Sequence, residues 1–179
     1  SEDLDAKLGG KTIPEICTLR RKMHFGKRFR SEYFILENAF YIMAPGLYFP
    51  VTGIANIVKQ YTAQDYLIDR RYRYFYLYFD RLESSADFER LRDLVENIYT
   101  NDYLNKQIVN WNQSLTAADG KSGLPQQLDF YSRYVRNNKE RTVVIISDAL
   151  RYEVGRTLFE KIQADEKCTA TISAMQAVL

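Results

Sequence analysis

Apolar residues recur every three to four positions along most of the chain, but one stretch has a different pattern. Val143-Val144-Ile145-Ile146 is an uninterrupted β-branched run without polar alternation, which is typical of a strand buried on both faces of a parallel sheet. Burial of each such side chain is worth roughly 1.5–3 kcal/mol. Ser147-Asp148 ends the run, and the pattern then predicts a helix over 149–164 and a second strand over 168–173. These elements predict a β-α-β unit with a right-handed crossover.

The part of the chain before this run has helical spacing, interrupted by turn and capping residues. Pro45-Gly46 is expected to end a first long helix, and the stretch 116–125 is expected to form a loop. Thr62 and Asn101 are interpreted as N-caps, because their side chains can accept hydrogen bonds from the free N–H groups of a first turn. The predicted helices cover 13–44, 52–60, 62–82, 84–99, 101–115 and 125–136.

The resulting fold class is an α-helical region followed by the first β-α-β unit of an α/β domain, mostly α overall. We expect a helical domain over 1–138 and the truncated N-terminal portion of an α/β domain over 139–179. The chain lacks an initiator Met and ends just after an apolar stretch, so we expect it to be a piece of a larger protein.

Composition narrows the function classes only slightly. With 46% hydrophobic and 27% charged residues, the 179-residue chain resembles an ordinary soluble globular protein. A net charge of +2 is too mild to indicate nucleic-acid binding from the overall balance. Cys17 and Cys168 have no metal-ligand spacing, which favours reduced thiols in a cytoplasmic protein. No apolar run is long enough to cross a membrane.

Asp148 is the main candidate for chemistry, since it follows the apolar run at the edge where ligands collect in open α/β sheets. One interpretation is an N-cap of the next helix, worth about 1 kcal/mol. The other is a metal ligand, although a zinc site needs three or four protein groups. Arg151 and Glu153 follow on the first helical turn and either support the site or form salt bridges on the helix face.

Two other stretches have a structural and a functional interpretation. In the run RRYRYFYLYFD, several rings share one helical face, so core packing is favoured over a platform on which nucleic-acid bases stack. These residues are Tyr72, Phe75, Tyr76 and Phe79. The stretch RRKMHFGKRFR contains no acidic residue, so it is either a solvated helix face or a surface for DNA or an acidic partner. Its cations are Arg20, Arg21, Lys22, Lys27, Arg28 and Arg30.

The motif IISDALRYEVG, which contains Asp148, resembles the opening strand and helix of the PglZ domain, a branch of the alkaline phosphatase superfamily found in BREX phage-defence systems. The stretches DRRYRYFYLYFDRLE and LRDLVENIYTNDYLNK resemble the helical region that precedes this domain in the larger PglZ proteins. The resemblance covers most of the chain from about Tyr61 onward.

The resemblance implies that Asp148 binds one active-site metal, zinc or another divalent cation. It also implies that the threonine or serine nucleophile and the later Asp and His ligands follow Leu179, so no catalytic residue is expected within this chain. His24 is expected at the surface or in helix packing. The parent protein would be a metal-dependent phosphoester hydrolase, a phosphatase or a nuclease, while this chain alone would be inactive.

A non-catalytic scaffold in a defence complex, with DNA contact as one role, is the alternative. The partners implied are other BREX defence proteins and DNA, with no membrane. Because a two-stranded sheet has unpaired edges, we also expect the isolated chain to self-associate through its open edge.

Overall fold

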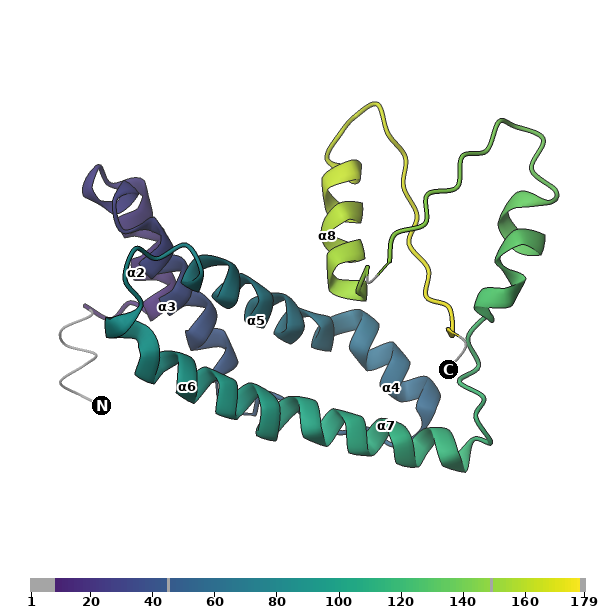
Figure 1. Ribbon diagram of the computed structural model, residues 1–179, viewed down its shortest axis with the longest axis horizontal. Helices are drawn as coiled ribbons and strands as arrows, with labels where there is room; N and C mark the ends of the chain where they lie inside the picture. Colours follow the sequence, from purple (N-terminus) through teal and green to yellow (C-terminus); the bar gives the residue numbers. More distant parts are fainter. Residues whose placement is uncertain (1–8, 45, 149, 178–179) are drawn as a thin grey trace. The chain divides into compact units, whose positions relative to one another are not determined.

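The structure is a computed structural model that describes residues 9–44, 46–148 and 150–177 (Figure 1). Helices provide nearly all of the regular structure in these residues. The chain forms two compact units. Unit 1 comprises Ser1–Pro50 and Leu67–Val109, and unit 2 comprises Val51–Tyr66 and Asn110–Leu179.

In the described part of unit 1, the first two helices, α2 (Ile13–Lys22) and α3 (Arg30–Ile42), pack together and are joined by a short 3₁₀ turn, η1 (Phe25–Lys27). The prediction of one helix over 13–44 is therefore wrong. Gly26 explains the break: it is buried in the turn, and a Cβ there would lie 1.8 Å from the carbonyl oxygen of Arg20. Only glycine allows the chain to fold back this closely onto the end of α2.

The next helical stretch runs without a break from α4 (Ile54–Gln60) through a π-helical segment, η2 (Tyr61–Asp65), into α5 (Tyr66–Phe79). The expected N-cap at Thr62 is wrong. Its hydroxyl instead donates to the carbonyl oxygens of Val58 at 2.8 Å and Lys59 at 3.2 Å. A threonine bonded to the preceding turn in this way is compatible with a continuing helix.

A second continuous stretch follows the short turn η3 (Ala86–Phe88). It consists of α6 (Glu89–Asn97), the π-helical segment η4 (Ile98–Leu104) and α7 (Asn105–Ala117). The predicted cap at Asn101 is wrong, because the helix passes through it while its side-chain amide bonds to Asn97. The sequence from Glu89 to Ala117 contains no Gly or Pro, so nothing there forces the helix to end.

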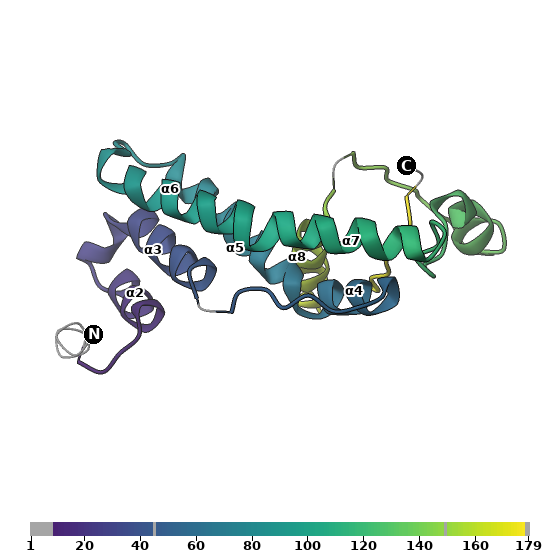
Figure 2. The same cartoon turned by 90° about the horizontal axis from the view of Figure 1, so that it is seen from below.

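The core of unit 1 lies between α3, α5, α6 and η4, which Figure 2 shows from below. Phe75 is fully buried, whereas Tyr72, Tyr76 and Phe79 are partly buried and pack around the core. This confirms the prediction that the aromatic face of α5 is a packing surface. The buried residues of this cluster are Ile35, Ala39, Ile42, Phe75, Val95, Tyr99 and Tyr103.

Tyrosine hydroxyls at the margin of this core converge on one carboxylate. Tyr72 and Tyr76 donate hydrogen bonds of 2.6 and 2.5 Å to the same oxygen of Glu96, and the Tyr72 ring stacks on Tyr99. Burial and the hydrogen bond to Glu96 raise the pKa of Tyr76 to about 12, and they raise the pKa of Tyr72 as well. Both tyrosines therefore stay protonated, and hold α5 to α6, well above neutral pH.

This pKa shift predicts a selective loss of stability in alkali. Because the folded state raises the Tyr76 pKa from 10 to about 12, its contribution is complete below pH 10 and is lost as the pH rises through 12. Denaturant titrations should show that Tyr76→Phe destabilises the chain at pH 8 and that this difference shrinks by pH 12. A difference that does not change with pH would contradict the assignment.

Unit 2 contains α4, η2 and the end of α7, followed by the predicted loop after Ala117. The predicted helix over 125–136 is present as a helical stretch over 127–135, in which the 3₁₀ turn η5 (Gln127–Asp129) leads through Phe130 into the π-helical segment η6 (Tyr131–Val135). Gln176 holds the loop: its side-chain oxygen accepts from the Ser122 hydroxyl at 2.6 Å, and its backbone forms a parallel bridge with Gln126.

The expected β-α-β unit is not found. Its helix is present as α8 (Tyr152–Gln163), but neither 143–146 nor 168–173 forms a strand in the part of the chain that the structure describes. The apolar run is extended and exposed, with Ile145 and Ile146 each 86% accessible. A strand needs hydrogen-bonded neighbours, and among the described residues no backbone hydrogen bond joins this run to another segment. Among the described residues, no helix is long and apolar enough to span a membrane.

Candidate functional site

Asp148 lies in a turn between the extended run and α8, in unit 2, and its side chain is exposed. It forms no hydrogen bond or ion pair with another described residue. The N-cap of α8 is Arg151, three positions later, so the interpretation of Asp148 as the helix cap is wrong. Asp148 is therefore a free carboxylate at the surface of this unit, which leaves it available as a ligand.

Arg151 and Glu153, the predicted supporting residues, occupy different environments. Arg151 is exposed, whereas Glu153 lies in the first turn of α8 and is only 1% accessible. The Glu153 backbone carbonyl accepts a hydrogen bond of 3.0 Å from the Thr157 hydroxyl, one helical turn further on. Their support of a site at Asp148 stays a prediction.

An aromatic cluster that sequence reasoning missed fixes the start of α8. The Tyr152 ring lies 5.7 Å from Tyr61 and 5.6 Å from Tyr66, between ring centroids. The Tyr152 hydroxyl donates to the carbonyl oxygen of Thr62 at 3.3 Å, and the Arg156 guanidinium lies over Tyr66 at 5.4 Å. These contacts join the helix after Asp148 to the π-helical segment η2.

The sequence does not predict this cluster, because Tyr152 is about 90 residues away from the tyrosines that it contacts. Each tyrosine fits its own local helical pattern, so only the fold reveals that Tyr61 and Tyr66 meet Tyr152. The π-helical segment η2 is a structural feature that is frequent at functional sites. It has no strong sequence signature, so it is recognised only once the fold is known.

The described residues do not form a complete metal site. They contain no group of three or more His, Cys, Asp or Glu side chains arranged to hold an ion, whereas zinc takes three or four protein ligands. The two cysteines are free, and His24 is exposed in unit 1. Asp148 has the right chemistry for one ligand of a divalent cation, but the residues present do not fit the whole set.

The structure divides the basic stretch Arg20–Arg30 into two groups. Arg21 packs inward: it pairs with Glu37 and lies over the Phe34 ring at 4.1 Å. The other five cations are exposed and form no ion pair with any described acidic side chain. These five are Arg20, Lys22, Lys27, Arg28 and Arg30. The stretch therefore contains one structural arginine and a set of cations available at the surface.

Comparison with known proteins identifies the region around Asp148. Residues 130–179 match the family described as the BREX system PglZ alkaline phosphatase-like domain. The chain is 38% identical over 177 residues to an alkaline phosphatase-like protein PglZ from Bacillus cereus (strain H3081.97), which covers 92% of the chain and 21% of that protein. It is 31% identical over 137 residues to the alkaline phosphatase-like protein BrxZ from Escherichia coli O9:H4 (strain HS), which covers 70% of the chain and 16% of that protein.

The chain thus spans about a fifth of the length of these curated relatives. No solved structure matches it significantly. The matched family segment begins within unit 2, just before η6, and includes both Asp148 and α8. On these matches, the chain belongs to the PglZ family of BREX alkaline phosphatase-like proteins.

Proposed function

We propose that the chain is part of a PglZ-type phage-defence protein whose alkaline phosphatase-like domain hydrolyses phosphoesters with divalent metal ions. The observation that carries this proposal is the family match over residues 130–179, which contains an exposed, unpaired carboxylate at Asp148. When bound, zinc or a similar cation would polarise a phosphoester and stabilise the charge of a developing alkoxide.

The role of this chain in that chemistry is to present Asp148 as one ligand. Its carboxylate does not cap helix α8. The contacts of Tyr152 with Tyr61 and Thr62 hold α8 against η2. The remaining ligands and the hydroxyl nucleophile would come from other residues of the full-length protein, since the described residues supply no further set. We therefore expect this chain alone to have no hydrolase activity.

The β-α-β arrangement belongs to the same proposal. The apolar residues of 143–146 are exposed here and have the composition of a central strand, so in the full-length protein we expect them to pair with strands formed by other segments. This would bring Asp148 to the carboxyl edge of the sheet. A boundary near residue 138 between a helical domain and this domain is also part of the proposal. Self-association of the isolated chain through the unpaired run is expected only while those partner strands are absent.

The proposed cellular setting follows from the family and the cysteines. Other BREX proteins are the expected partners, as the family description names that system. Cys17 is buried and free, and Cys168 is exposed and free, a pattern suited to the reducing cytoplasm.

Metal removal tests the function. A full-length protein that contains this chain should hydrolyse a chromogenic phosphodiester or phosphomonoester, lose activity on dialysis against a chelator, and regain it with Zn²⁺, Mn²⁺ or Mg²⁺. Bound metal should be measured in the same samples. A folded, metal-loaded protein without turnover on either ester would favour the alternative function, a non-catalytic scaffold within the defence complex.

A further inference from the structure

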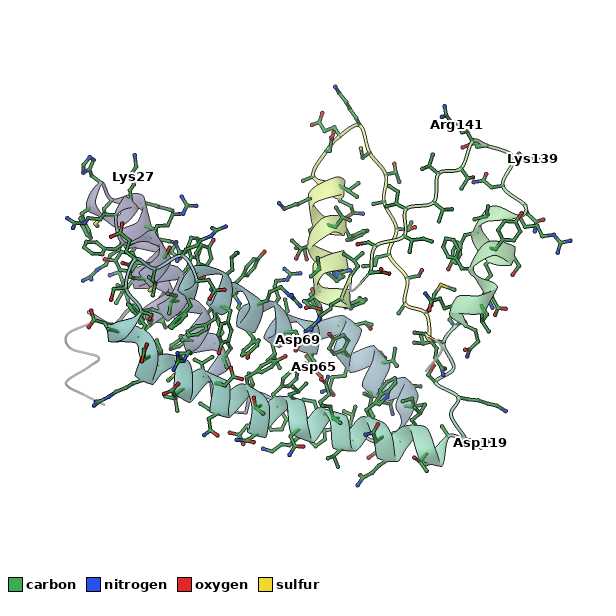
Figure 3. All side chains as sticks on the ribbon, viewed as in Figure 1. Lys27, Asp65, Asp69, Asp119, Lys139 and Arg141 are labelled. Atoms are coloured by element: carbon green, nitrogen blue, oxygen red, sulfur yellow. The ribbon has the colours of Figure 1, made fainter. Side chains whose placement is uncertain are left out.

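The turn between α2 and α3 in unit 1 concentrates positive charge. Figure 3 labels Lys27 at this turn, at the end of the purple helical pair. No Asp or Glu occurs between Glu15 and Glu32, whereas Arg20–Arg30 contains six Lys and Arg residues. These six exceed the net charge of the whole chain, +2, so the rest of the chain is net negative. Positive charge is therefore concentrated in one stretch of the chain. A surface that needed charge only for solubility would not require this concentration.

Exposed apolar side chains lie among these cations. Met23 and Phe25 are each 49% accessible and Phe29 is 43% accessible. The Arg28 guanidinium lies 5.6 Å from the centre of the Phe29 ring, so a cation and an aromatic face are presented together. We call this surface the basic tip, comprising Arg20, Lys22, Met23, Phe25, Lys27, Arg28, Phe29 and Arg30.

The backbone of the basic tip is tightly organised. The N–H groups of Met23, Gly26 and Arg28 donate to the carbonyls of Arg20, Met23 and Phe25 at 3.0–3.1 Å. The buried Gly26 packs directly against the end of α2, and the Arg21–Glu37 pair joins α2 to α3 just beside it. The exposed cations therefore project from a fixed turn, which reduces the entropy lost on binding.

We propose that the basic tip binds single-stranded nucleic acid, with the cations on phosphates and the exposed rings of Phe25 and Phe29 against bases. Guanidinium groups match phosphate geometry, and aromatic side chains stack on bases without needing a particular sequence. An anionic membrane is a poorer fit, because membrane-surface binding typically uses a continuous amphipathic helix with a broad apolar face, and the tip is a short turn. The proposal does not depend on hydrolase activity.

The test is fluorescence anisotropy of a labelled 20-nucleotide mixed-sequence DNA strand titrated with the 179-residue chain at several salt concentrations. The triple variant Lys22→Glu/Lys27→Glu/Arg28→Glu should bind at least 10-fold more weakly. Its log Kd against log salt slope should fall by about 2, since each neutralised phosphate on a single strand contributes about 0.7. Phe25→Ala should weaken binding several-fold while leaving the salt slope unchanged.

The matched control is Lys121→Glu/Lys139→Glu/Arg141→Glu, which makes the same change in net charge at exposed positions of unit 2. It should retain most of the affinity, and circular dichroism should show equal helix content in all variants. Equal loss in the control would overturn the proposal in favour of a general charge effect. Absence of binding by the unmodified chain, or binding to phosphatidylglycerol vesicles but not to the strand, would also overturn it. No outcome involves hydrolysis, so failure here is distinct from failure of the proposed function.

Discussion

Replacing Phe75 by alanine is expected to lower the free energy of unfolding of the chain by about 3–5 kcal/mol, the range for large aromatic residues in a packed core. Phe75 has no accessible surface and packs on Phe79 and Tyr76 within the core of unit 1. Truncation would remove a whole ring and leave a cavity between α3, α5 and α6. Denaturant titration followed by far-UV circular dichroism measures the change.

Leu77→Ala is the matched control, because Leu77 lies two positions away on α5 and is 39% accessible. It should cost less than about 1.5 kcal/mol, as expected for a half-exposed apolar side chain. Phe75→Leu should fall between the two, since it keeps part of the volume. Similar losses for Phe75→Ala and Leu77→Ala would refute the assignment of the aromatic face to the core.

The helical core was predictable because its signal is local. Tyr72, Phe75, Tyr76 and Phe79 repeat at helical spacing, and the face they define is the one that packs. The helix boundaries were harder to predict. Thr62 and Asn101 are good cap residues, yet the helix continues through both, since a cap preference of about 1 kcal/mol does not end a helix that tertiary packing favours. The break between α2 and α3 at Gly26 was not predicted from the sequence.

The strand prediction shows a different limit. The pattern of Val143–Ile146 describes an environment, burial on both faces, and that environment must be supplied by segments distant in sequence. The described residues supply none, so the same side chains are extended and exposed. The candidate site shows this limit too. Asp148 was found from a local motif, whereas the Tyr61, Tyr66 and Tyr152 contacts that fix the neighbouring helix come from the fold.

In a full-length protein that contains this chain, Asp148→Ala is expected to reduce metal-dependent phosphoester hydrolysis at least 100-fold while leaving the fold intact. The carboxylate is exposed and does not cap α8, so its removal breaks no described contact. Loss of one anionic ligand, by contrast, weakens the hold on a divalent cation. Activity, bound metal and thermal stability should be measured together on each variant.

Asp148→Asn is the sharper substitution, because it preserves the size of the side chain and one acceptor oxygen but removes the negative charge and the second oxygen that hold a cation. A ligand role requires Asn to be nearly as inactive as Ala, with less metal bound and an unchanged melting temperature. Asp165→Asn is the matched control: it is another exposed aspartate in the region matched to the PglZ domain, just after α8, and should stay active. If the Asp148→Asn protein is active and binds a full complement of metal, the negative charge of Asp148 is not needed for metal binding. The proposal that Asp148 is a metal ligand would then be wrong.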